Sequence, residues 1–567
     1  MLGTPSLVEL CATQAAASCA VDEIAAAVAW LPTEAIERVW AHMSAKRLRK
    51  FELALPSACP DDAVALLEAL QAQWRERIRR DVRSLNHKLD SSKYFDNASE
   101  ATTFIATTRV TTCYRRAYWE HQFRKRLVEH DMDHVAGAAA SADDVPLALF
   151  SGVVHQVKVR GREMTRANVD VLLSLPSIER LELHHAQVSD DLWRLLSELI
   201  ETLPALREVC LLHSKLPTVA PLLAAMARRR GHPIDVLGFS SVKMSPIALR
   251  EIVASFQRDG GSRLCRLRLN NSVTDVAGVN ALVACGSRAL DTLVLQFNEL
   301  EDEALDDLTE PSNLKHVSLA HNCLTNIGPV AHCRQLLSLD LSSNELGDAG
   351  ASQLATDVLP HLTNLTALYL VNCTITDVGA AVLLPAITTQ AHIATLNLSR
   401  NFVGPAFGTE LSAFIASNTV VHTLHLSSIG LGDTPPSPFL VALASNRTLR
   451  RLSLGENRLR NQGAVAVFCA LVQRAALVPF EAVDLRGNLL SDDGLRSLVA
   501  ATSGRKRKAS QLKWSSDAHL IDELNLQDNV FQPETVREAF QRLAPCIQHV
   551  FMSHIEPAST VAYDDEA

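Results

Sequence analysis

The sequence is poor in aromatic residues, which make up 5% of its 567 residues, and its 12 cysteines are scattered without a single C-x-x-C pair. Without such pairs, spacing supports neither a cysteine-based metal site nor thioredoxin-like redox chemistry. Scattered cysteines of this kind are typical of reduced thiols in the cytosol or nucleus. Abundant leucine and alanine favour helices and stacked leucine layers over an aromatic-rich sandwich.

Long apolar runs and targeting features are also missing. No run reaches the roughly 18–20 residues that a membrane-spanning helix needs. The apolar stretch at residues 4–17 has no basic segment before it and no early arginine, which argues against a secretory signal and a mitochondrial presequence. We therefore expect a soluble intracellular protein, nuclear or cytoplasmic, with no membrane partner.

Catalytic motifs are the third absence. The sequence contains no GxxxxGK[ST], HExxH or GxSxG motif, and no GxGxxG after a strand. His184 and His185 are adjacent, so in a strand they point to opposite faces and do not share a metal easily. We expect a non-enzymatic protein with no catalytic residue, no metal, no cofactor and no small-molecule substrate.

What the chain does contain is an internal repeat with the pattern LxxLxLxxNxL. Clear copies begin at residues 290, 314, 336, 365, 393, 449 and 480, and weaker copies begin at 178, 206, 234, 264, 421 and 521. Measured at the Asn position of the pattern, most steps between copies are near 28 residues. The region therefore holds about thirteen units.

This pattern resembles leucine-rich repeats of the longer, ribonuclease-inhibitor type, in which each unit is a strand followed by a helix. Residues 347–354 and 376–383 look like helix starts. One unit cannot bury its own apolar face, so the units stack into a solenoid. We predict an α/β leucine-rich-repeat solenoid over residues 150–550, with a parallel sheet on its concave face.

The residue between the two leucines of each LxL points away from the core, because side chains alternate along a strand. Candidate partner-binding residues on this concave face are Glu182, Arg268, Asp340, Tyr369, Asn397, His425 and Asp484. The row is mixed in sign and lacks the basic stripe expected of a nucleic-acid track. It suits a protein or peptide partner, although Arg268 is also a remote candidate for insertion into a GTPase.

The remaining segments differ in composition. Residues 1–135 read as an all-helical domain, 136–149 as a small-residue linker, and 551–567 as an acidic tail. The repeat step lengthens to 41 between Asn488 and Asn529, where an insert at 503–514 carries a basic cluster at 505–508. That cluster is either a nuclear import signal or a solvated loop.

The first of the N-terminal segments forms an amphipathic stripe. Leu7, Leu10, Cys11 and Ala15 fall at helical spacing on one face. The pattern is similar to the BC-box, the helix by which substrate receptors bind elongin C. The resemblance implies that these four residues contact elongin C.

Three further segments extend this resemblance to the N-terminal region of elongin A. They are LPTEAIERVW (31–40), LRKFE (48–52) and QWRERIRRDV (73–82). The resemblance implies a BC-box followed by F-box-like helices, with Leu31, Pro32 and Trp74 on the cullin side. The sequence departs from the family at Val82 and in an insertion at 85–104.

Taken together, these features predict a substrate receptor of an elongin–cullin ubiquitin ligase, with elongin C, a cullin and a substrate protein as partners. An alternative is a structural scaffold in a large cytoskeletal or ribonucleoprotein assembly, in which the N-terminal helices only cap the solenoid. A further alternative rests on residues 109–127, where basic and aromatic residues interleave in a manner that suits nucleic acid.

Overall fold

The computed structural model describes residues 152–552, except 188, 258–263, 274, 310–311, 391, 403–407, 476–477, 504–518 and 544–545, together with 39–40, 43, 48, 120, 122–124, 127 and 150. The chain divides into two compact units: unit 1 is Met1–Arg268 and unit 2 is Leu269–Ala567. Of the expected N-terminal helical domain, the described residues at 39–40, 48, 120, 122–124 and 127 are helical. The basic cluster at 505–508 lies outside the described residues.

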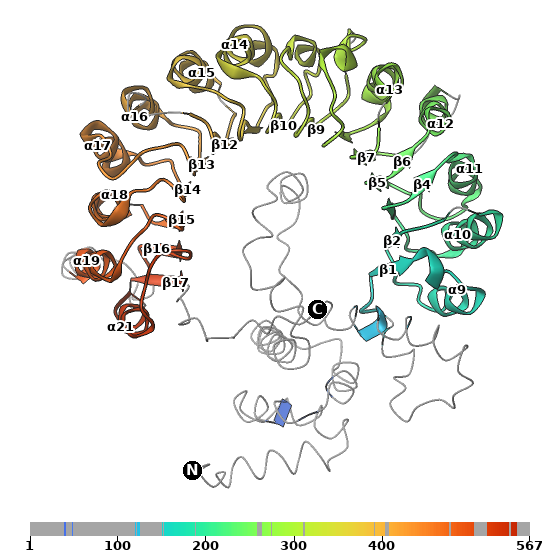
Figure 1. Cartoon of the computed structure of the whole chain (residues 1–567), viewed down its shortest axis with the longest axis horizontal. Coiled ribbons are helices and arrows are strands. Elements are labelled where there is room, and N and C mark those ends of the chain that lie inside the picture. The colour runs from blue at the N-terminus through green and yellow to red at the C-terminus, as the bar shows by residue number, and fades with distance from the viewer. Residues whose placement is uncertain are drawn as a thin grey trace, which may run out of the picture. The chain divides into compact units, whose positions relative to one another are not determined.

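Unit 1 alternates strands and helices. Its elements are β1 (Gln156–Arg160), η3 (Gly161–Glu163), α9 (Arg166–Leu173), β2 (Arg180–His184), α10 (Asp190–Thr202), β3 (Glu208–Leu212), β4 (Lys215–Leu216), α11 (Ala220–Arg228), β5 (Val236–Ser240), β6 (Lys243–Met244), α12 (Pro246–Gln257) and β7 (Arg266–Asn270), inside which the division between the units falls. The main strands lie in the order β1-β2-β3-β5-β7, and β4 pairs with β6 in a second, two-stranded sheet. The helices lie on the outer side of the strands (Figure 1).

Unit 2 continues the alternation. Its elements are α13 (Val276–Ala289), β8 (Thr292–Val294), η4 (Asp302–Leu305), β9 (His316–Ser318), η5 (Gly328–His332), β10 (Ser338–Asp340), α14 (Gly347–Gln353), η6 (Leu354–Val358), η7 (Leu359–His361), β11 (Ala367–Tyr369), α15 (Asp377–Thr389), β12 (Thr395–Asn397), α16 (Gly408–Ser417), β13 (Thr423–His425), α17 (Ser437–Ser445), β14 (Arg451–Ser453), α18 (Arg460–Ala475), β15 (Phe480–Asp484), α19 (Asp492–Ser503), β16 (Ile521–Asn525), α21 (Pro533–Leu543) and β17 (Ile547–Phe551). Its strands lie in sequence order from β8 to β17. The helices again lie outside the strands (Figure 1).

These elements confirm the predicted strand-and-helix repeat with parallel strands. Each of the thirteen repeats found in the sequence contributes one main strand: β2, β3, β5 and β7 through β16. Two strands had no match to the pattern, β1 before the first repeat and β17 after the last. Among the described residues, no helix is both long enough and apolar enough to cross a membrane.

The leucines of the repeat form the core between strands and helices. In the repeat that contains β14, Leu449, Leu452 and Leu454 are at most 2% exposed. Burying one such side chain stabilises the fold by about 1.5–3 kcal/mol, so the three leucines account for much of what one repeat gains on folding.

The predicted helix starts are confirmed at α14 and α15, where the Thr376 hydroxyl caps α15 by accepting a hydrogen bond from the backbone N–H of Val378. Not every repeat has an α-helix. The steps from Asn298 to Asn322 and from Asn322 to Asn344 are only 24 and 22 residues long. This length leaves room for a single 3-10 turn, so η4 and η5 stand where longer repeats place an α-helix.

A ladder of buried asparagines links the loops of unit 2. Asn457 is fully buried, and its Nδ2 donates to the carbonyls of Leu426, at 2.8 Å, and Leu454, at 3.0 Å. Its Oδ1 accepts the backbone N–H of Ile429, in the preceding repeat, at 3.0 Å. The same pattern recurs at Asn298, Asn322, Asn344, Asn401, Asn488 and Asn529. Each asparagine therefore satisfies buried backbone groups of two neighbouring repeats.

Unit 1 lacks this ladder. Its residues at the same repeat position are Ala186, Ser214 and Val242. Only Ser214 imitates the asparagine, because its hydroxyl accepts the N–H of Ala186 at 3.0 Å and donates to the carbonyl of Leu212 at 2.9 Å. In unit 1 the backbone after this position is instead tied by the short strands β4 and β6.

Candidate binding surface

The strand faces opposite the leucine core carry the predicted partner-binding residues. In unit 2, strand register places Asp340, Tyr369, Asn397 and His425 side by side, and Ser453 separates His425 from Asp484. In unit 1, Glu182 and Arg268 lie on β2 and β7 of the same sheet. The predicted elongin and cullin contacts, Leu7, Leu10, Cys11, Ala15, Leu31, Pro32 and Trp74, lie outside the described residues.

In unit 1 the strand face is a ladder of charges centred on Glu182. This carboxylate is buried and accepts hydrogen bonds from Gln156 Nε2 at 2.7 Å and Arg180 Nε at 2.9 Å. Lys158 Nζ lies 3.1 Å and His184 Nε2 3.4 Å from its second oxygen. Burial opposes ionisation, but the bond from His184 and the charges of Arg180 and Lys158 outweigh it and lower the pKa of Glu182 to about 2.

The ladder continues to a second carboxylate. Glu208 Oε1 lies 2.9 Å from Arg180 Nη1 and 3.2 Å from Arg268 Nη1. It also accepts the thiol of Cys210, at 3.5 Å. Burial raises the pKa of Cys210 to about 12, so this thiol stays protonated and is a poor nucleophile.

In unit 2 the strand face is built instead from amides and hydroxyls. Gln296 Nε2 donates to Ser318 Oγ at 2.8 Å, and Ser318 Oγ donates to Asp340 Oδ2 at 3.0 Å. The other oxygen of Asp340 accepts the backbone N–H of Ser342 at 3.1 Å. Burial raises the pKa of Asp340 even though the bonds from Ser342 and Ser318 act against it. The carboxylate is therefore held in place without a cation.

The bond from a side-chain oxygen to the N–H two residues later recurs along this row. Asn397, Asp484 and Asn525 accept the backbone N–H of Ser399, Arg486 and Gln527, each at 3.0 Å. Such bonds lock the side-chain torsions of the acceptor, because the donor belongs to the same chain segment. The row is thus arranged before any partner arrives.

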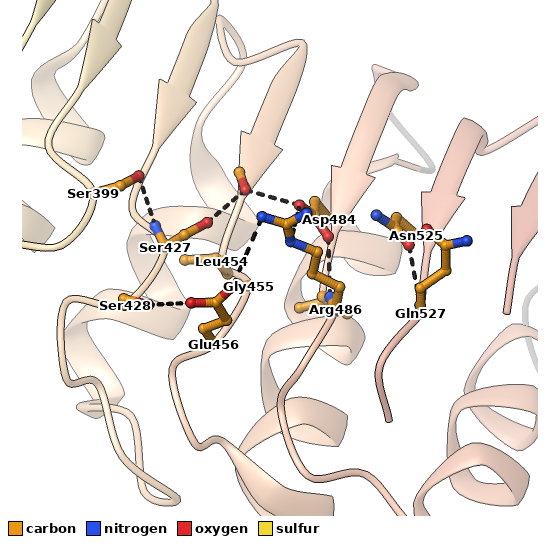
Figure 2. A network of polar contacts seen from close by, with 12 residues as sticks. Ser399, Ser427, Ser428, Leu454, Gly455, Glu456, Asp484, Arg486, Asn525 and Gln527 are labelled. Carbon is orange, nitrogen blue, oxygen red and sulfur yellow. Dashed lines mark hydrogen bonds and ion pairs between the residues drawn. The ribbon is translucent and has the colours of Figure 1, made fainter. Parts of the chain in front are cut away.

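Figure 2 shows a polar network on this surface, which includes Ser427, Glu456, Asp484 and Arg486. The hydroxyls of Ser427 and Ser453 lie 2.8 Å apart, and Ser453 Oγ donates to Asp484 Oδ2 at 3.2 Å. Arg486 Nη2 lies 3.8 Å from Glu456 Oε1, and its Nε lies 3.8 Å from Asp484 Oδ2. Strands from three successive repeats therefore share one polar network.

Two of the predicted residues have environments that limit their chemistry. Tyr369 is 6% exposed, and burial followed by the charge of Arg451 lowers the pKa of His425 to about 4. His425 is therefore neutral at physiological pH and offers a hydrogen bond, not a charge. Glu182, Asp340 and Asn397 are also buried, while Arg268, His425 and Asp484 are half-buried. All seven stay predictions as partner contacts.

Sequence reasoning missed a second row of side chains, next to the strand ends. These residues, here called the αL row, precede the Asn position of each repeat and have φ between +47° and +62°: His185, His213 and Ser241 in unit 1, and Asn271, Phe297, His321, Ser343, Asn372, Arg400, Ser428, Glu456, Gly487 and Asp528 in unit 2. The sequence shows that this position recurs in every repeat. It does not show that the backbone there has a positive φ, because most of these residues are not glycine. Rings stack along the row, Phe297 on His321 with centroids 4.0 Å apart and His185 on His213 at 5.1 Å.

Within the described part of the chain, no three His, Cys, Asp or Glu side chains gather in a way that would hold a metal ion. The polar groups of both strand faces are engaged with one another.

Comparison with known proteins places the repeats among leucine-rich repeats. A family described as "Leucine Rich repeat" matches residues 332–355, 361–384 and 445–468. The ribonuclease inhibitor of Sus scrofa is 25% identical over 339 residues, which cover 56% of this chain and 74% of that protein. The ribonuclease inhibitor of Mus musculus is 27% identical over 230 residues, 38% of this chain and 50% of that protein.

A second kind of relative is larger than this chain. The "NACHT, LRR and PYD domains-containing protein 3" of Macaca mulatta is 30% identical over 219 residues, which are 36% of this chain and 21% of that protein. Among solved structures, an internalin of Listeria monocytogenes matches 75% of this chain and 94% of its own at 15% identity, with a TM-score of 0.32. The sequence matches support leucine-rich repeats of the ribonuclease-inhibitor type, a fold that serves as a scaffold for protein binding.

Proposed function

We propose that this chain is a non-enzymatic receptor that holds a protein partner on the strand face and the αL row of its repeats. The observation that carries this proposal is the network of Figure 2, in which Ser427, Ser453, Asp484, Arg486 and Glu456 fix one another across three repeats. A surface whose side chains are already ordered loses less conformational entropy on binding. The name of one relative, ribonuclease inhibitor, describes a protein that acts on another protein.

The test compares two exposed ion pairs of unit 2. Arg400 and Glu456 lie 3.9 Å apart in the αL row and are 62% and 42% exposed. Asp493 and Arg496 form a pair of 2.9 Å on the outer helix α19. Both pairs contribute little to stability, so alanine at either pair leaves the fold intact.

We expect affinity purification with mass spectrometry to lose partners when Arg400 and Glu456 become alanine, and to keep them when Asp493 and Arg496 do. Equal recovery with both double variants would show that the αL row does not bind the partner. Loss of partners with the outer variant alone would place the binding surface on the helices.

We further propose that the partner is a substrate and that the chain is its receptor in an elongin–cullin ubiquitin ligase. The support is the BC-box-like stripe of Leu7, Leu10, Cys11 and Ala15, followed by the elongin A-like segments up to residue 82. The receptor would act by proximity, because a substrate lysine held near the ligase reacts in an effectively unimolecular step. Leu31, Pro32 and Trp74 would face the cullin.

This finer proposal has its own experiment. Leu7→Asp with Cys11→Asp should abolish co-purification of elongin C, because charge enters the apolar stripe. The matched control is Ala12→Asp with Thr13→Asp, which adds the same charge on the opposite side of the helix. Unchanged recovery of elongin C with the first variant would refute the proposal. Stoichiometric recovery with a large assembly, without elongin C or a cullin, would favour a structural scaffold.

A further inference from the structure

Unit 1 gathers basic side chains where its main strands end. The residues concerned, here called the basic lip, are Arg162, His185, His213, Lys215 and Lys243. Lys215 of β4 and Lys243 of β6 are register partners on neighbouring parallel strands, and both are exposed (Figure 1). The backbone of Gln187 pairs with that of Lys215, which brings the end of β2 to the same edge.

The imidazoles adjoin these lysines. His185 and His213 are exposed, stack with centroids 5.1 Å apart, and precede Gln187 and Lys215 by two residues each. Arg162 follows Gly161, whose Cα has no room for a side chain because a Cβ there would lie 2.7 Å from Ala186 Cα. The close approach of these two backbones places residue 162 near the backbone of His185.

The buried carboxylates of the neighbouring strand face are paired with other cations. Glu182 and Glu208 are engaged with Lys158, Arg180 and Arg268 on the strand face. Lys215 and Lys243 form no ion pair with any residue that the structure describes. Two like charges directly across a strand pair are destabilising unless an anion lies between or over them.

At the same position of the repeat, unit 2 has a single basic residue, Arg458. There the residues that correspond to Lys215 and Lys243 include Glu299, Glu345, Thr374 and Phe402. The whole chain carries a net charge of -9, so the positive edge is local and opposite in sign to the protein. An edge of this kind attracts acidic partners by long-range steering as well as by contact.

We infer that the basic lip binds an acidic segment of a protein partner, a short run of Asp or Glu side chains laid across β4 and β6. This inference rests on the proposed protein-binding function and names the class of partner and the surface. Neighbouring strands lie about 4.8 Å apart, so the lip spans only about 10 Å over three repeats. That length suits two or three carboxylates and is short for a single-stranded nucleic-acid track of four or more nucleotides.

The experiment uses the full chain and a fluorescein-labelled peptide of eight glutamates, followed by fluorescence anisotropy. We expect saturable binding that weakens as salt rises, because exposed charges are screened. Lys215→Glu with Lys243→Glu should weaken binding at least tenfold, and Lys215→Gln with Lys243→Gln about threefold. The glutamine variant keeps the strand pair free of new charge, so it tests the lip even where the reversed charges disturb folding.

The matched control is Arg194→Glu with Arg250→Glu, two exposed arginines on helices α10 and α12 of the same unit. It changes the net charge equally and should leave peptide binding within twofold of the unmodified chain. Equal weakening by control and lip variants, or tighter binding of an eight-nucleotide uridine oligomer than of the peptide, would overturn the inference. If the lip variants bind the peptide normally while the Arg400 and Glu456 variant still loses its partners, only this inference fails and the proposed function stands.

Discussion

The two units carry the same leucine pattern but tie their loops together in different ways. Unit 2 uses buried asparagines such as Asn457, whose amide bonds to the backbone of two repeats. Unit 1 has Ala186, Ser214 and Val242 there and pairs β4 with β6 instead. The leucine core therefore does not require one particular loop, provided that the buried backbone groups find partners.

The strand faces of the two units also differ in the interactions that hold their side chains in place. Unit 1 orders its face with ion pairs around Glu182 and Glu208, whereas unit 2 orders its face mainly with amides and hydroxyls around Asp340 and Asp484, with Arg486 beside Asp484. The first arrangement rests on opposite charges, and the second rests mainly on hydrogen bonds. The comparison separates two chemistries that one repeat can present to a partner.

The largest effect should come from the asparagine ladder. Asn457→Ala leaves the N–H of Ile429 and the carbonyl of Leu426 buried without partners, which should cost about 3 kcal/mol of local stability. Ser214→Ala in unit 1 should cost about 1 kcal/mol. Hydrogen exchange by mass spectrometry, on peptides covering 421–431 and 178–188, measures both. Equal costs would mean that Asn457 ties its neighbouring repeat no more strongly than Ser214 does.

Glu182→Gln should have the next largest effect, about 2 kcal/mol less stability at pH 7, because Arg180 and Lys158 lose their counter-charge. The pKa of Glu182 is lowered to about 2, so its contribution is present above the pKa of about 4.3 that the residue has in the unfolded chain and is lost as the pH falls toward 2. Thermal unfolding at pH 7 and pH 4 should show the gap between the two proteins narrowing in acid. If the stability difference between variant and parent is the same at both pH values, the lost stability comes from packing and not from charge.

Asp340→Asn should act in the opposite direction. Burial raises the pKa of Asp340, so ionising this side chain costs stability at pH values above its unfolded-state pKa. Asparagine keeps the acceptor for the N–H of Ser342, as Asn397 does for Ser399, and should add about 1 kcal/mol at pH 7. This gain should vanish as the pH falls below the unfolded-state value. A variant less stable than the parent at pH 7 would contradict the expectation.

The smallest effect concerns the position after the asparagine. Leu489 of unit 2 has φ of +60°, a region that disfavours leucine, so Leu489→Gly should stabilise the protein by about 0.5 kcal/mol. Lys215 of unit 1 has the extended backbone of β4, and Lys215→Gly should destabilise by about the same amount. Chemical denaturation of each variant beside its parent checks the signs. If both glycine variants changed the stability in the same direction, the different backbone conformations of Leu489 and Lys215 would not explain the changes.

By itself the sequence determined what depends on spacing within one repeat. The spacing of the leucines predicts which residues form the core. The T-D-V-G pattern predicts the start of α15 at its cap Thr376. The repeated asparagine position indicates the ladder of unit 2. Each of these features depends on residues a few positions apart, so it can be predicted from the sequence without knowledge of the fold. Even the shortened repeats of unit 2 follow from counting, since 22 to 24 residues leave no room for a full helix.

Only the tertiary structure decided what depends on neighbours from other repeats. Residues 28 positions apart become register partners, as Glu182 and Cys210 do, and this contact sets which charges pair and which thiol is buried. Burial of Asp340 and the like-charge pair of Lys215 and Lys243 arise in the same way. The sequence lists the side chains of each strand face, but their pKa values and ion pairs are properties of adjacent strands, because electrostatic and hydrogen-bond energies depend on distances of a few ångströms.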